Sequence, residues 1–134
     1  MNWKLASMLA AVTLTFGCHK GAYEARTEPQ AAYENTETVV LLGGDIRRSI
    51  AVEGQQAKLA EDGRLQVFAN IRNRWTKRLT VQGQTVFKDE NGFSTGDETA
   101  WETMIITERS QTSYQTTSQN TNARKYTIRI RSLR

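Results

Sequence analysis

The clearest pattern in the chain is an alternation of apolar and polar residues that recurs over its last two thirds. Every second residue from Leu65 to Ile71 is aliphatic, and similar alternations run from Leu79 to Phe87 and from Tyr126 to Ile130. A period of two places the apolar side chains on one face of a β-strand. We therefore predict strands over 65–72, 79–87 and 125–132.

Turn-forming residues separate these strands from weaker ones. The apolar run Val39–Leu42 is closed by two glycines, Asp62-Gly63 is typical of a tight hairpin, and Asp89–Gly92 is typical of a turn. Further strands are expected over Ile46–Val52 with a bend at Arg47-Arg48, from Phe93, over Trp101–Thr107, and over the Thr- and Gln-rich segment Ser110–Ser118, which suits a sheet edge. A short helix over Gln55–Ala60 or Thr99–Met104 is the alternative for those two segments.

The pattern as a whole indicates an all-β domain. Six to eight short strands at near-regular spacing, each with one apolar face, predict an antiparallel sandwich or barrel over residues 39–134. No long helical period is visible in the sequence.

The first residues follow a different pattern. One lysine precedes an apolar run, Leu5–Phe16, which is followed by Gly17 and Cys18. This arrangement is typical of a signal peptide over 1–17, and the run is shorter than the ~20 residues of a transmembrane span. Leu14 to Cys18 resembles a bacterial lipobox, although Thr15 and Phe16 depart from it. We expect lipidation of Cys18; a buried helix or a chance cysteine are the alternatives.

Residues 18–38 are predicted to be a flexible tether. They are rich in Glu, Thr, Gln and Ala, contain the only proline, Pro29, and show no apolar period. Lipidated proteins retained in the bacterial inner membrane usually carry Asp after the cysteine, whereas this chain has His19. By that analogy the expected location is the periplasmic side of the outer membrane.

Charge narrows the classes of partner. The formal net charge is +4, with a balance of −2 over residues 19–38 and +5 over residues 39–134. A basic domain beside a membrane favours anionic partners such as lipid head groups or peptidoglycan, and nucleic acid is not expected outside the cytoplasm. An ordinary surface with an excess of arginine is the simpler alternative.

The residues that most catalytic sites need are missing from the domain. The only histidine is His19 and the only cysteine is Cys18, so Ser-His-Asp and Cys-His sites are not expected. The sequence has no metal-ligand spacing and no phosphate-binding loop, so no metal or cofactor is expected. The adjacent carboxylates Asp89-Glu90 and Asp97-Glu98 would point to opposite faces of a strand, which favours solvated turns over a hydrolase dyad.

Basic residues around an aromatic residue form the candidate binding site. Trp75 lies in a predicted loop with four Lys or Arg neighbours, and Trp and Arg are enriched at binding hot spots. The candidate residues of this segment are Arg72, Arg74, Trp75, Lys77 and Arg78. The alternative is that Trp75 closes one end of the core, as we expect of Trp101. Arg129 and Arg131 share the polar face of the last strand, and they would extend the positive surface if that strand neighboured the one ending at Arg72.

Residues 64–131 resemble the YcfL-type periplasmic lipoproteins. The resemblance rests on Asn73 at the end of a strand, on Phe87–Gly92, where the family favours Trp-x-Asp-x-x-Gly, on Trp101, and on the closing strand Ala123–Arg131. Phe87 replaces the family's tryptophan, and the family's Ala-Pro before the last strand is absent. The resemblance implies an immunoglobulin-like sandwich under a lipid anchor. Such proteins are often encoded beside a lipoprotein activator of penicillin-binding proteins, so the resemblance implies a role in the cell envelope or cell wall.

These observations predict a non-catalytic lipoprotein that binds or assembles with another envelope protein, through a loop end or an open sheet edge. The alternative is a binder of anionic wall polymer or lipid head groups through an arginine-rich sheet face. A carboxylate-dependent hydrolase that uses Asp89 and Asp97 is a third, lesser hypothesis.

Overall fold

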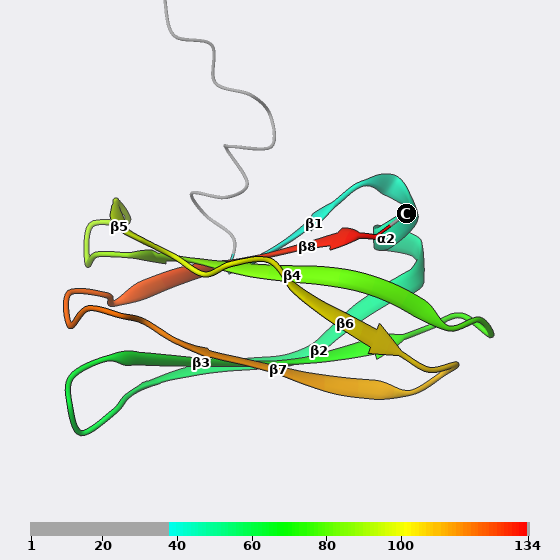
Figure 1. Cartoon of the computed structure of the whole chain (residues 1–134), viewed down its shortest axis with the longest axis horizontal. Coiled ribbons are helices and arrows are strands. Elements are labelled where there is room, and N and C mark those ends of the chain that lie inside the picture. Colours follow the sequence, from blue (N-terminus) through cyan, green and yellow to red (C-terminus); the bar gives the residue numbers. More distant parts are fainter. Residues whose placement is uncertain (1–37, 134) are drawn as a thin grey trace, which may run out of the picture.

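The computed structural model describes residues 38–133, in which two β-sheets pack face to face (Figure 1). In the five-stranded sheet, β8 lies between β1 and β4, while β5 and β6 pair with opposite halves of β4. Its strands are β1 (Val39–Leu42), β4 (Leu79–Lys88), β5 (Ser94–Glu98), β6 (Glu102–Ile106) and β8 (Lys125–Ser132).

The three-stranded sheet has β3 at its centre. Its strands are β2 (Ile50–Leu59), β3 (Leu65–Asn73) and β7 (Gln111–Thr117), in the order β2-β3-β7. A short helix, α2 (Gly44–Ser49), joins β1 in one sheet to β2 in the other. The predicted β-sandwich is therefore confirmed, and its sheets are antiparallel except where β1 runs parallel to β8.

The core fills the space between the sheets. Val67 and Ile71 of β3 and Ile128 and Ile130 of β8 are fully buried, as their alternation predicts. The sheets approach closely at Gly83, where a Cβ atom would lie 3.0 Å from Met104 Cε and 3.2 Å from Tyr114 Cε2. A side chain at this position would therefore press on Met104, in the neighbouring strand β6, and on Tyr114, in the facing sheet.

The strong alternations are confirmed as strands β3, β4 and β8. The predicted turns are also confirmed. Gly63 and Gly92 have positive φ angles of 82° and 89°, and Ala60 N donates to Arg64 O across the β2–β3 hairpin at 2.8 Å. Ser110–Ser118 contains β7, which is an edge strand as expected because it pairs only with β3 among the described strands.

The prediction of a bent strand over Ile46–Val52 is wrong in its first half, because residues 44–49 form α2. Ser49 Oγ donates to Asp45 O at 2.9 Å. Asp45 in the first turn and two arginines in the last turn suit the helix dipole. The alternative helices over Gln55–Ala60 and Thr99–Met104 are also wrong, since these segments contribute to β2 and β6.

The expected signal peptide, Cys18 and most of the tether lie outside the described residues. Between residues 38 and 133, no helix is long and apolar enough to cross a bilayer.

Candidate functional site

Three connections meet at one end of the sandwich. Strand pairing sets Ile50 opposite Asn73 and Leu79 opposite Ile106, so α2, the β3–β4 loop and the β6–β7 loop lie together, at the right of Figure 1. We call this region the basic end. Its exposed cationic residues are Arg47, Arg48, Arg74, Lys77, Arg78 and Arg109, and its acidic residues are Asp45 and Glu108.

Asn73 organises the two loops of the basic end. Its side chain is fully buried, and Nδ2 lies 2.6 Å from Lys77 O, 3.1 Å from Ile106 O and 3.0 Å from Thr107 O. Its Oδ1 accepts from Trp75 N at 2.8 Å. One amide therefore fixes the backbone of both loops. The sequence shows Asn73 at the end of a strand but gives no sign of this role, because its partners come from a distant segment.

Trp75 borders a hollow of about 330 Å³ at this end. The residues that line it are Arg74, Trp75, Thr76, Lys77 and Arg109. Trp75 is 39% exposed, so part of its indole ring is accessible to a partner. An exposed indole flanked by cations suits a surface that binds an anionic partner and also contacts it through an aromatic ring.

Arg109 is the residue of this hollow that the sequence did not reveal. Its N–H donates to Trp75 O at 3.1 Å, and its φ of 54° lies in the left-handed region, which non-glycine residues rarely adopt. The β6–β7 loop is distant in sequence from Trp75, so the sequence alone could not show that Arg109 and Trp75 line the same hollow.

Arg72 and Arg78 lie outside the lining of this hollow. Arg72 pairs with Glu53 on the outer face of the three-stranded sheet, and its Nη2 donates to Gln111 Oε1 at 3.3 Å. The hydrogen bond with Glu53 raises the pKa of Arg72 above its ordinary value. Glu53 thus offsets the positive charge of Arg72, whereas Arg78 is an exposed member of the basic end.

The condition for a positive surface shared by Arg72, Arg129 and Arg131 is not met, because β8 and β3 belong to different sheets and are not neighbours. Arg129 Nη1 donates to Gln84 Oε1 at 3.3 Å, and Arg131 Nε donates to Gln82 Oε1 at 2.9 Å.

The expectation that Trp101 belongs to the core is also wrong. Trp101 is only partly buried, and the guanidinium carbon of Arg131 lies 3.9 Å from the centre of its ring. Trp101 therefore packs against a cation on the outer face of the five-stranded sheet rather than between the sheets.

The carboxylates of the hydrolase hypothesis have structural partners. Asp89 Oδ1 accepts from Asn91 N at 2.9 Å and from Phe93 N at 3.0 Å, as a turn residue would. Asp97 is buried rather than solvated, and it accepts from the backbone N–H groups of the β7–β8 loop at Gln119 and Asn120. Its neighbour Glu98 is exposed, so the two carboxylates do not converge. No group of three metal-ligating residues occurs within 38–133.

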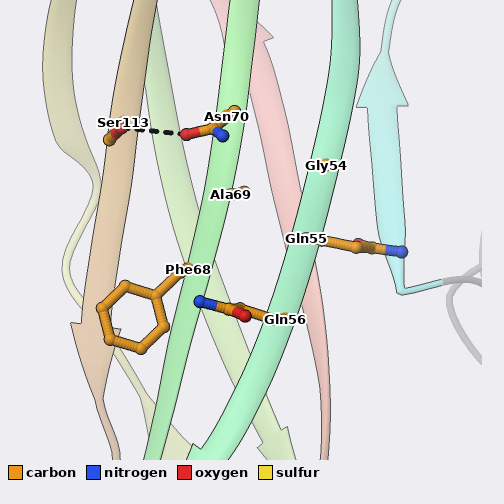
Figure 2. Close-up of a pocket in the computed structure, with 7 residues that line it drawn as sticks. All are labelled: Gly54, Gln55, Gln56, Phe68, Ala69, Asn70 and Ser113. Carbon is orange, nitrogen blue, oxygen red and sulfur yellow. Dashed lines mark hydrogen bonds between the residues drawn. The ribbon is translucent and has the colours of Figure 1, made fainter.

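A second hollow, of about 380 Å³, lies on the outer face of the three-stranded sheet (Figure 2). Its lining residues are Gly54, Gln55, Gln56, Phe68, Ala69, Asn70 and Ser113, none of which is charged. At Gly54 a Cβ atom would meet nothing within 4 Å, so this position borders open space. Sequence reasoning missed this hollow because three strands each contribute ordinary polar residues to it.

Comparison with known proteins identifies the family. Two crystal structures share the fold: that of Campylobacter jejuni cj0090 has a TM-score of 0.62 and 20% identity and covers 72% of this chain and 98% of its own. A DUF1425 family member from Shewanella sp. pv-4 has a TM-score of 0.57 and 22% identity and covers 63% of this chain and 79% of its own. Comparison with curated proteins gives no match. The model of the family described as "Protein of unknown function (DUF1425)" matches residues 37–132, and the chain therefore belongs to the DUF1425 family.

Proposed function

We propose that the chain is a YcfL-like lipoprotein held on the periplasmic side of the bacterial outer membrane by lipid on Cys18. Its sandwich acts as a non-catalytic module that binds another envelope protein through the basic end. The anchor is supported by the apolar run that ends in Gly17-Cys18. One acyl chain holds a protein only weakly and two hold it firmly, so multiple acylation at Cys18 would keep the module at the membrane.

The observation that carries the binding role is the exposed Trp75 beside Arg74, Lys77 and Arg109. Hydrogen bonds of the buried Asn73 side chain hold this surface in one arrangement. Pre-organisation lowers the entropy that a binding surface loses on association. The partner that this surface fits is a protein with an acidic patch and a pocket for an indole ring.

A second candidate partner is an anionic polymer or lipid head group, such as peptidoglycan carboxylates. The six cationic side chains of the basic end favour it. We assign this alternative to the basic end rather than to the arginine-rich sheet face. On that face, Arg129 and Arg131 donate hydrogen bonds to glutamines, and Arg131 also packs on the ring of Trp101.

Labelling with radioactive palmitate tests the anchor. The wild-type chain should carry label and the Cys18→Ser variant should not. An unlabelled wild type would contradict the lipid anchor and the membrane location that depends on it.

Co-sedimentation of the lipidated chain with envelope fractions over a series of salt concentrations tests the binding role. For a protein partner, Trp75→Ala should reduce binding at least tenfold and added salt should weaken it modestly. For a polyanion, the Arg74→Gln/Lys77→Gln/Arg109→Gln variant should lose binding, Trp75→Ala should change it little, and binding should fall steeply with salt. If none of these changes affects binding, the basic end is not the binding surface.

A further inference from the structure

The edge of the three-stranded sheet at β7 lacks the features that keep exposed edges from pairing. Its sequence, Gln-Thr-Ser-Tyr-Gln-Thr-Thr, contains no charge, glycine or proline, and its register with β3 is unbroken over seven residues. Natural sheets usually protect an edge with charges, bulges or short strands. The β7 edge is therefore a regular template for another strand.

The other described edges are protected. The β2 edge carries Glu53 and Lys58, and its register shifts between Val52 and Gly54. On the five-stranded sheet, β1 has four residues and β5 and β6 have five each, with acidic residues in both β5 and β6. Among the described edge strands, β7 is therefore the one without charges, a register shift or a short length to protect it.

The hydrogen-bond pattern shows which groups of β7 point outward. Asn73 N donates to Ser110 O at 2.8 Å and Ser118 N donates to Leu65 O at 2.9 Å. Since bonded residues alternate along an antiparallel pair, Thr112, Tyr114 and Thr116 bond to β3. The N–H and C=O groups of Gln111, Ser113, Gln115 and Thr117 therefore point away from the sheet.

We infer that β7 pairs with β7 of a second copy of this chain, antiparallel about a two-fold axis at Tyr114, to form a six-stranded sheet. In this register Gln111 faces Thr117 of the other copy and Ser113 faces Gln115. All four outward-pointing residues then fall in hydrogen-bonded pairs, and all seven residues of each strand are used.

The side chains and the charge distribution favour a second copy as the occupant. The facing pairs on the outer surface are neutral hydrogen-bonding residues, so no like charges oppose each other. Each β7 begins near the basic end and runs away from it. Antiparallel pairing therefore separates the two basic ends by about 20 Å along the strand, more than the ~8 Å screening length.

Disulfide formation between two variants tests the register. Two variants of the full-length chain are made, one with Gln111→Cys and one with Thr117→Cys, and both also carry Cys18→Ser. They are kept in mild detergent because of the apolar run Leu5–Phe16. Oxidising the mixture should give a covalent dimer, because facing Cα atoms about 5.5 Å apart suit a disulfide. Each variant alone should remain monomeric on a non-reducing gel, since identical positions would be about 20 Å apart.

A mixture of the Gln111→Cys chain with a Gln56→Cys chain is the matched control, because Gln56 is exposed on the β2 edge. The control should give no dimer. Equal yields in the control and the test mixture, or efficient self-linking of Gln111→Cys, would overturn the proposed pairing.

Charge exchange tests the same contact without a thiol. By sedimentation, the wild-type chain should show a dimer, and Ser113→Lys/Gln115→Lys should be monomeric because it sets lysines opposite each other. Mixing this variant with Ser113→Glu/Gln115→Glu should restore the dimer. A wild type that stays monomeric, or a lysine variant that dimerises like the wild type, would contradict the inference.

Discussion

Two buried polar side chains connect parts of the sandwich that are distant in sequence. Asn73 ties the β3–β4 loop to the β6–β7 loop, and the hydroxyl of Tyr114 in β7 lies 2.9 Å from Thr85 Oγ1 in β4. Buried polar groups of this kind contribute most when every hydrogen bond is made, because a lost partner leaves another polar group unsatisfied.

Replacing Asn73 should destabilise the fold and disorganise the basic end. We expect Asn73→Ala to lower the free energy of unfolding by about 2–4 kcal/mol, because buried carbonyl groups and Trp75 N lose their partner. Asn70→Ala is the matched control, since Asn70 lies on the same strand but is exposed, and its change should stay within about 0.5 kcal/mol. Urea denaturation measures both, and equal small effects would contradict the role given to Asn73.

Tyr114 should make stability depend on alkaline pH. Burial raises the pKa of Tyr114 above its ordinary value of 10.0 in the folded chain. The folded state thus favours the neutral hydroxyl, so its contribution is fully present below pH 10 and is lost as pH rises through the folded pKa. Tyr114→Phe should cost about 1 kcal/mol at pH 7 and less above pH 10. A cost that does not shrink in urea titrations above pH 10 would show that Tyr114 does not titrate in this way.

At the scale of secondary structure, the sequence predicts best where the two faces of a strand differ strongly. The alternations of β3, β4 and β8 place aliphatic residues against the core, and their bounds follow from the pattern. The helix α2 was missed because the spacing from Ile46 to Ile50 fits a helical turn as well as a strand, and six residues are too few to separate the two periods.

The close approach of β4 to the facing sheet gives a test of packing. Gly83→Ala should lower the free energy of unfolding by about 1–3 kcal/mol, because the new methyl would press on Met104 and Tyr114. Gly54→Ala is the matched control, because it also replaces a strand glycine but enters open space. It should change stability by less than about 0.5 kcal/mol. Thermal denaturation compares the two, and a harmless Gly83→Ala would contradict the close packing described at this position.

At the scale of the whole molecule, charge is organised by which loops share an end of the sandwich. The net charge of the chain is +4, and the basic residues near Trp75 in the sequence include two, Arg74 and Lys77, that line one hollow with it. The sequence did not reveal Arg109, or that Arg72 lies on a different sheet from Arg129 and Arg131, because both depend on the pairing of strands distant in sequence.

Site-specific photocrosslinking in intact cells tests the central claim, that the basic end is the binding surface of an envelope-anchored module. A photoreactive residue replaces Thr76 beside Trp75 or, as the matched control, Asn91 in the β4–β5 turn at the opposite end. We predict an adduct with an envelope component from position 76, lost when Trp75→Ala is added, and none from position 91. Adducts from position 91 alone would contradict the account, whereas adducts from position 76 that persist with Trp75→Ala would contradict a protein partner that holds the indole ring.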